Sequence, residues 1–210
     1  MKKSLIFIVI FCMALNQLSA QQVASPLKTI VKTYQLIQQM NKKLNGTINA
    51  ALGGISRTLI PITLPAFTIE WNYSFSTSRD GSAAKNLQLG SQLATLVSKI
   101  IPGAGVFTGL SESALSSIIT PSGSIPVNVY LLDPNNANAF INNRQFNYYA
   151  QNSATNATQA TMTVRDLTSG TWYIAIENYS ARSAVLVDIE AVAIQSMVVH
   201  PSSMKKHNDQ

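Results

Sequence analysis

The clearest pattern in the chain is an alternation of apolar and polar side chains between Phe67 and Ser76. Every second position carries a large apolar residue and the positions between carry polar ones: Phe67, Ile69, Trp71, Tyr73 and Phe75 against Thr68, Glu70, Asn72, Ser74 and Ser76. A period of two predicts a β-strand over 67–77. Its aromatic face is typical of a strand packed on a core, and a platform that stacks on sugars is the alternative.

Shorter runs of β-branched and aromatic residues, bounded by turn residues, predict further strands near 58–64, 126–132, 145–150, 159–166, 171–178 and 184–194. Asp133-Pro134 predicts a helical turn over 134–142, because aspartate caps helices and proline suits the first helical position. About seven strands suit an antiparallel β-sandwich, so we expect an α+β fold that is mainly β.

Two regions change to helical spacing. In 27–45, after Ser25-Pro26, apolar residues recur every three or four positions: Leu27, Ile30, Val31, Tyr34, Ile37, Met40 and Leu44. The basic residues Lys28, Lys32, Lys42 and Lys43 lie off this stripe. We expect an N-terminal amphipathic helix, either docked on the domain or lying on a membrane surface.

The second region, 85–119, predicts a helical hairpin that is broken at Pro102-Gly103-Ala104-Gly105 and inserted between strands. Its few charges are Lys85, Lys99 and Glu112, which indicates that both helices are covered. The sheet is the usual cover for such helices, and a partner protein or lipid fits the same composition.

The first twenty residues have the pattern of an export signal. Lys2 and Lys3 precede an apolar run, and Leu18-Ser19-Ala20 offers a cleavage site. We therefore expect a bacterial protein exported to the periplasm or the extracellular space. Cys12 does not indicate a lipoprotein, because the bulky Phe11 precedes it where a small residue is typical.

The expected organisation is a signal peptide at 1–20, the N-terminal helix and a connector at 21–57, the sandwich with its insertion at 58–195, and a flexible tail at 196–210. Without Lys2 and Lys3, thirteen basic residues face nine acidic ones, a net charge of +4. This mild, scattered charge does not favour nucleic acid as a partner.

Most catalytic chemistries lack the residues they need. Cys12, the one cysteine, is removed with the signal, so no thiol remains for catalysis or metal binding. The two histidines, His200 and His207, lie in or near the tail, so the folded body lacks the histidine that a Ser-His-acid triad or a histidine metal site needs. Most of the carboxylates lie on polar strand faces or at turns, so we do not expect an enzyme. These carboxylates are Glu70, Glu112, Asp133, Asp166, Glu177, Asp188 and Glu190. The oxygen-rich run from Asp133 to Asn138 fits a calcium loop or a helix cap equally, and we expect no metal or cofactor.

A candidate binding surface lies in the Asn-rich stretch 135–149. Its aromatic residues are Phe140, Phe146, Tyr148 and Tyr149, which gather near amide side chains. The alternative is that these four rings complete the core. Carbohydrate and another envelope protein are the partner classes that such a surface indicates.

The segment from Leu167 to Ser180, with its Gly170-Thr171-Trp172-Tyr173 step, resembles the turn and strand of bacterial pre-peptidase C-terminal modules. The resemblance covers about the last seventy residues and implies a non-catalytic β-sandwich associated with secreted enzymes, in some cases with carbohydrate or surface binding. This chain departs from the pattern because helices are expected over 85–119 and no catalytic domain accompanies the module. No functional residue is carried over.

Together these features predict a secreted or periplasmic, non-catalytic β-sandwich that acts as a binding or structural module. The alternative is a protein that associates with a membrane surface, or forms an assembly, through the helix 27–45 and the hairpin 85–119.

Overall fold

The computed structural model describes residues 27–80, 87–100 and 106–199. The chain divides into two compact units: Met1–Lys28 with Val199–Gln210, and Thr29–Val198. The first unit lies almost wholly outside the described residues, as do the predicted signal 1–20 and the tail from 200 onward. The second unit contains the fold described below.

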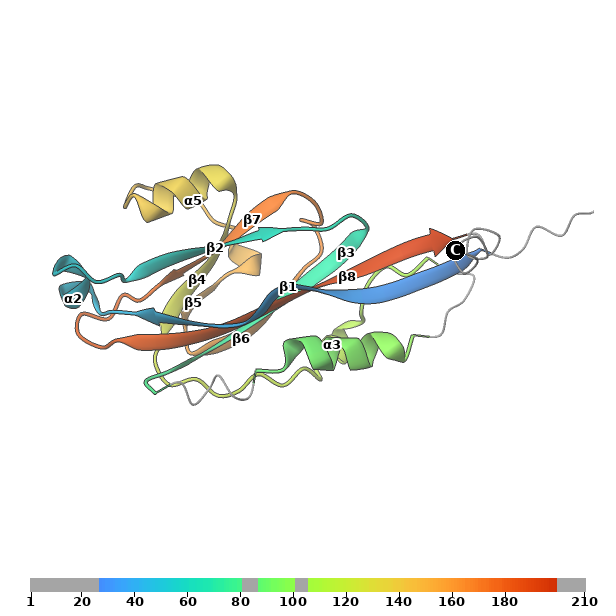
Figure 1. The fold of residues 1–210 in the computed structure, drawn as a ribbon, viewed down its shortest axis with the longest axis horizontal. Coiled ribbons are helices and arrows are strands. Elements are labelled where there is room, and N and C mark those ends of the chain that lie inside the picture. The colour runs from blue at the N-terminus through green and yellow to red at the C-terminus, as the bar shows by residue number, and fades with distance from the viewer. Residues whose placement is uncertain (1–26, 81–86, 101–105, 200–210) are drawn as a thin grey trace, which may run out of the picture. The chain divides into compact units, whose positions relative to one another are not determined.

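Two four-stranded antiparallel sheets form this unit, which confirms the mainly β sandwich (Figure 1). The eight strands are β1 (Lys28–Leu44), β2 (Arg57–Thr63), β3 (Thr68–Ser78), β4 (Val127–Leu132), β5 (Ala154–Ala157), β6 (Gln159–Val164), β7 (Thr171–Glu177) and β8 (Val185–Val199). The first sheet has the order β1-β8-β3-β6 and the second the order β2-β7-β4-β5. This order is the eight-stranded jelly-roll arrangement of two facing sheets.

The main core lies between the two sheets and follows the alternation along β3. Trp71, Tyr73 and Phe75 are fully buried in it, facing Leu131 and Ile174 of the second sheet. The two polar atoms on these rings are satisfied, because Trp71 Nε1 donates to Leu167 O (2.8 Å) and Tyr73 Oη donates to Asn152 O (2.6 Å). Burial raises the pKa of Tyr73 far above its ordinary value. From Trp71 onward the aromatic face of β3 is therefore core. The prediction is wrong for the first two apolar positions, because Phe67 precedes the strand and is 63% exposed, and Ile69 packs with the cluster on the outer face, where the register shifts between Thr68 and Glu70.

Helices α3 (Leu89–Ser98) and α4 (Glu112–Leu115) cover the outer face of the first sheet, with α3 visible below the sheet in Figure 1. The apolar stripe of α3, which includes Leu93 and Val97, packs on Val192 and Ile194 of β8. The α3 part of the expected hairpin thus packs on the sheet of its own domain.

Helix α5 (Pro134–Ile141) covers part of the outer face of the second sheet. Asp133 caps it: its Oδ1 accepts hydrogen bonds from the backbone N–H groups of Asn135 (2.8 Å) and Asn136 (2.9 Å). Although partial desolvation opposes them, these bonds and one from the Asn136 side chain lower the pKa of Asp133. The Asp133–Asn138 run is therefore a helix cap.

The helix predicted over 27–45 is wrong, because this segment is strand β1. Leu36, Met40 and Leu44 pack on the core between the sheets, while Val31 and Gln35 contact the outer-face side. An interval of four residues fits one helical turn and equally two repeats of a strand, so this spacing did not separate the two structures. The polar residues between are those of an edge strand, where lysine is common.

The strand predicted over 145–150 is also wrong. Residues 143–149 form a loop, followed by the short 3₁₀ turn Ala150–Asn152. The backbone N–H of Asn147 donates to the side chain of Asn136 (2.7 Å), so this backbone bonds to a side chain instead of a strand. The short polar strand β5 and the helix α2 (Thr47–Ala51), which lies in the expected connector, were not predicted.

Candidate functional site

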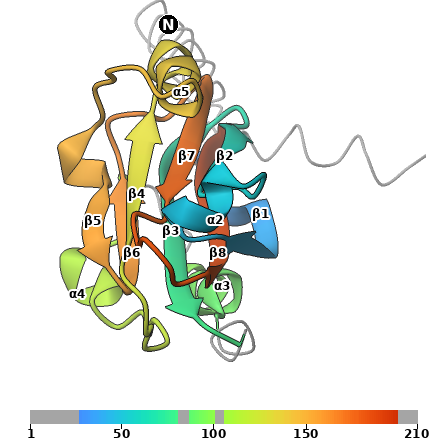
Figure 2. The same ribbon diagram turned by 90° about the vertical axis from the view of Figure 1, so that its left-hand side faces the viewer.

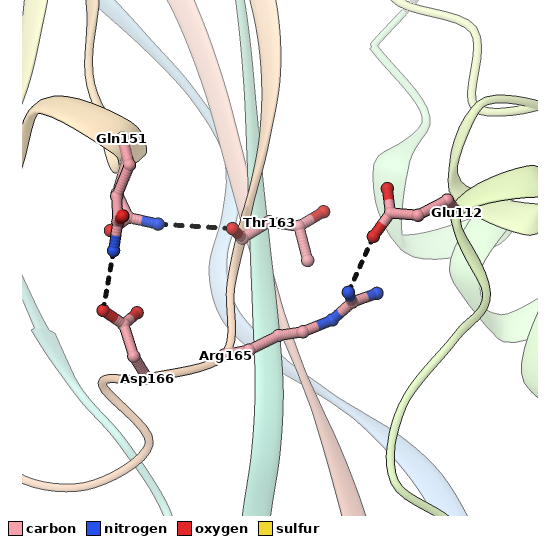
Figure 3. Close-up of a pocket in the computed structure, with 6 residues that line it drawn as sticks. Glu112, Gln151, Thr163, Arg165 and Asp166 are labelled. Atoms are coloured by element: carbon pink, nitrogen blue, oxygen red, sulfur yellow. Dashed lines mark hydrogen bonds and ion pairs between the residues drawn. The ribbon is translucent and has the colours of Figure 1, made fainter.

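A polar pocket lies beside the edge strand β6, at the end of the sandwich where β3 begins (Figure 3). It has a volume of about 380 Å³ and is lined by Glu112, Gln151, Asn152, Thr163, Arg165 and Asp166. We call it the Arg165 pocket. Its size lies within the usual range of small-molecule sites, roughly 300–1,000 Å³.

Three separate parts of the fold bring these side chains together. Thr163 lies near the end of β6, and Arg165 and Asp166 follow directly after the strand. The 3₁₀ turn supplies Gln151 and Asn152, and the first residue of α4 is Glu112. Because β6 is an edge strand, its outer side is open to the turn and to α4, and the pocket forms between them.

Arg165 forms one wall and holds two carboxylates. Its Nε donates to Glu70 Oε2 (3.1 Å), its Nη1 donates to Glu112 Oε1 (2.7 Å), and its Nη2 donates to the carbonyl of Leu110 (2.6 Å). The hydrogen bonds from Glu112 and Glu70 raise the pKa of Arg165. Glu70 is fully buried, so Arg165 compensates a carboxylate that water cannot reach.

The backbone also approaches Glu70 closely. Leu110 N donates to Glu70 Oε2 (3.2 Å), and the preceding Gly109 has a φ of 126°. A Cβ at Gly109 would lie 2.5 Å from Glu70 Oε2, so only glycine fits there. This arrangement fixes the chain that leads into α4, and with it the position of Glu112.

The opposite wall carries amides. Gln151 Nε2 donates to Asp166 Oδ2 (2.9 Å), and Asn152 Nδ2 donates to the carbonyl of Thr163 (3.3 Å). Asn152 is 4% exposed, and its Oδ1 has no hydrogen-bond partner among the described residues. Figure 3 shows Gln151 and Asp166 on one side of Thr163 and the Arg165–Glu112 pair on the other.

This set of groups suits hydrogen bonding to a neutral ligand. Arg165 uses three of its five N–H groups, while Asp166 and Gln151 each keep an acceptor oxygen free of the bonds described above. Glu70 and Glu112 bond to the single guanidinium and Asp166 adds a third carboxylate on the opposite wall, which disfavours an anionic ligand. The two carboxylates at the pocket surface, Glu112 and Asp166, are solvent-exposed, whereas acid–base catalysis commonly uses a carboxyl group in an apolar environment. Within the described ranges, no group of three or more His, Cys, Asp or Glu side chains could hold a metal ion.

The predicted aromatic surface forms only in part. Phe146 and Tyr148 pack with Tyr130 at ring-centroid distances of 5.3 and 4.9 Å, and Phe140 is fully buried beneath them with Arg57 over its ring. Desolvation, followed by the nearby Glu177 carboxylate, raises the pKa of Tyr130.

Tyr149 does not join this cluster. It packs edge to face on Trp172 (5.4 Å) against the core between the sheets. Tyr148, 43% exposed, is the member of the four predicted residues that offers most of its ring to solvent.

Sequence reasoning named Glu112 and Asp166 among the carboxylates but did not place them in one pocket, and it missed Gln151, Asn152 and Arg165. These residues belong to elements that are distant in the chain, and no local motif joins them. An arginine directly after an edge strand, followed by an acid, is the one weak signal in the sequence.

A scan against protein-family models finds no match for this chain, and a search of curated proteins finds no relative. In the part of the chain that the structure describes, no helix has the length and apolar character needed to cross a bilayer.

Proposed function

We propose that this protein is an exported, non-catalytic β-sandwich module that binds a neutral, hydroxyl-rich ligand such as an oligosaccharide in the Arg165 pocket. The observation that carries the proposal is the convergence of a guanidinium, two amides and two exposed carboxylates on one hollow of ligand size. Planar groups of this kind hydrogen-bond to hydroxyls that project from a sugar ring, and a few well-placed polar groups fix a ligand's orientation.

Two further features support a binding role. The pocket side chains are held by bonds to one another and to the sheet, which lowers the entropic cost of ordering them when a ligand binds. The resemblance of the segment 167–180 to pre-peptidase C-terminal modules indicates the same class of non-catalytic secreted sandwich.

Screening on an array of neutral and uronic-acid oligosaccharides, followed by titration calorimetry, tests the proposal. We expect neutral glycans to bind and acidic ones not to bind. Gln151→Ala and Asp166→Ala should each weaken binding about tenfold, because each removes a hydrogen-bonding group worth roughly 1.5 kcal/mol.

Gln39→Ala is the matched control for Gln151→Ala, since Gln39 is an exposed glutamine on β1, outside the pocket. Tyr148→Ala tests the aromatic surface as the alternative site. Binding that survives both pocket substitutions and is lost with Tyr148→Ala would move the site to the aromatic cluster. An array with no neutral glycan bound would refute the proposal.

A further inference from the structure

Four aliphatic side chains project from one end of the sandwich without cover from the described residues. Leu52 is 83% exposed, Ile55 58%, Ile48 50% and Ile141 44%. They come from α2, from the turn after it and from the last residue of α5. We call this set the apolar tip. Isolated exposed aliphatic residues are common on protein surfaces, but a group of four at one end indicates an interaction site.

The backbone beneath the apolar tip is firmly held. Thr47 N donates to Ser180 O (2.9 Å) and Ile48 N donates to Ala181 O (3.1 Å), which ties α2 to the loop between β7 and β8. Asn45 N donates to Ile55 O (2.7 Å) and closes the loop at its base. The fold therefore presents these side chains outward from an ordered support.

A hollow of about 410 Å³ separates the α2 part of the tip from α5. Ala50, Ala51 and Ile55 line one side of it, and Ile141 lines the other. Figure 2 looks onto this end, with α2 in front and α5 above it. The floor carries Arg57, whose charge is matched by Glu177. The tip is thus a pair of apolar edges around a shallow depression.

Basic residues surround the apolar tip. β1 ends here with Lys42 and Lys43, Arg144 follows α5, and Arg182 lies in the loop between β7 and β8. Arg79 reaches the same end, because Ser78 pairs with Leu186 at the start of β8. None of these five takes part in an ion pair between described residues.

We propose that the apolar tip docks this protein peripherally on the surface of an anionic lipid bilayer. Aliphatic side chains that project from a rigid support enter the boundary between headgroups and acyl chains, while the flanking lysines and arginines meet anionic headgroups. The combination of apolar points and a basic rim matches such a surface in both chemistry and charge.

The docking is independent of the proposed ligand site. The Arg165 pocket adjoins Val164, which pairs with Trp71 near the start of β3, while the tip lies at the end of the sandwich where β3 finishes at Ser78. The seven residues of strand from Trp71 to Ser78 span about 23 Å at the usual rise per residue. The pocket therefore stays open when the tip is on the bilayer.

Vesicle flotation tests the docking directly. The mature protein is mixed with vesicles of phosphatidylcholine alone and with vesicles containing three parts phosphatidylcholine to one part phosphatidylglycerol. We expect flotation with the anionic vesicles and much less with the neutral ones. The double substitution Leu52→Asn with Ile55→Asn should lower partition onto anionic vesicles tenfold or more, since roughly two aliphatic side chains no longer enter the lipid. Lys42→Glu with Lys43→Glu should lower it by a further factor of about five per residue.

Ile119→Asn with Val106→Asn is the matched control, because both residues are similarly exposed aliphatics, 75% and 79%, that do not line the hollow at the tip. Flotation of this control like the parent, with loss in the tip variant, supports the proposal. Failure of the parent to float, equal flotation of the tip variant, or equal flotation with neutral vesicles overturns it. Concentration-dependent dimerisation that the tip variant abolishes, without flotation, would assign the tip to a second copy instead.

Discussion

Glu190 offers a sharp test of how the outer face of the first sheet is built. It lies on β8, is 8% exposed, and accepts hydrogen bonds from the first backbone N–H groups of helix α3: Leu89 N to Oε2 (2.8 Å) and Gly90 N to Oε1 (2.9 Å). Gln35 Nε2 of β1 also donates to Oε1 (3.1 Å). One carboxylate from the sheet thus serves as the N-terminal cap that α3 lacks among its own side chains.

Glu190→Ala removes the two oxygens that accept these three hydrogen bonds. Two of the donors are backbone groups at a helix start close to the sheet, and each costs about 1–2 kcal/mol when left without a partner. Gln35 loses less, because it also donates to the Ile37 carbonyl (2.7 Å). The expected loss of unfolding free energy is about 3 kcal/mol for Glu190→Ala, and about 1–2 kcal/mol for Glu190→Gln, which keeps one acceptor oxygen.

A double-substitution cycle with Gly90 makes the test specific. A Cβ at Gly90 would lie 2.7 Å from Gln35 Oε1 and 2.8 Å from Glu190 Oε1, so Gly90→Ala alone should destabilise despite a gain in helix propensity of about 1 kcal/mol. With Glu190→Ala present, half of this conflict is removed, and Gly90→Ala should become less harmful or neutral.

The measurements are urea unfolding for each of the four proteins and hydrogen exchange at Leu89 and Gly90. Exchange should accelerate at these amides in Glu190→Ala more than in the β-strands. A loss below about 0.5 kcal/mol for Glu190→Ala, or additive effects in the cycle, would refute the capping role, because surface substitutions give changes of that size.

Four further substitutions test other parts of the fold. Burial raises the pKa of Asp188, although the hydrogen bond from Asn41 opposes this effect, so between the unfolded and folded pKa values the native carboxyl holds a proton that the unfolded chain releases. The free energy of unfolding should therefore fall as the pH rises through the folded pKa. Asp188→Asn should remove this pH dependence in urea unfolding measured from about pH 3 to about pH 8. The lowered pKa of Asp133 has the opposite sign, with stabilisation present above the unfolded pKa and lost as the pH falls through the folded one; Asp133→Ala should cost about 1 kcal/mol at pH 7 and flatten that acid limb. Gly109→Ala should lower the free energy of unfolding by roughly 2 kcal/mol and the thermal midpoint by several degrees, because its φ and the nearby Glu70 both exclude a Cβ. Gly170→Ala is the control: a Cβ there meets open space, so its effect should show the cost of a positive φ alone.

The accuracy of sequence reasoning here depended on whether a pattern could be read locally. The alternation along 67–77 predicted β3 correctly, because strict period two over ten residues fits no helix. The stripe in 27–45 predicts a helix because its apolar residues recur every three or four positions, but the four-residue interval from Met40 to Leu44 is one that a strand also permits. Whether this segment forms a helix or a strand depends on its pairing with β8, some 150 residues away, and the local sequence pattern carries no information about that pairing.

The candidate site was beyond local reasoning for the same cause. Arg165 and Glu112 are separated by fifty-three residues and meet only because the segment before α4 is laid across β3 and β6. The predicted aromatic residues were close in sequence, yet the loop fold sends Tyr149 to Trp172 and leaves Phe146 and Tyr148 on Tyr130. Proximity along the chain was therefore a poor guide to proximity in the site.

The polar outer face of the first sheet joins the fold to the proposed ligand site. The segment that covers the β3–β6 side of it is held largely by side-chain hydrogen bonds, such as Ser76 Oγ to the Pro121 carbonyl (2.8 Å) and Thr120 with Thr161 (2.6 Å). Bonds of this kind contribute only about 1 kcal/mol each and open more readily than an apolar core.

Arg165 belongs to both structures, because it binds the Leu110 carbonyl and Glu112 of the covering segment and also lines the pocket. A ligand that contacts Arg165 or Glu112 therefore links the pocket to the cover, and hydrogen exchange at Leu110 and Ala114 should slow when an oligosaccharide binds. Exchange at Thr47, whose amide donates to Ser180 O outside the pocket and its cover, should stay unchanged and serves as the internal reference. Equal slowing at all three amides would mean that the ligand stabilises the whole domain and that the cover and the pocket are not specifically coupled.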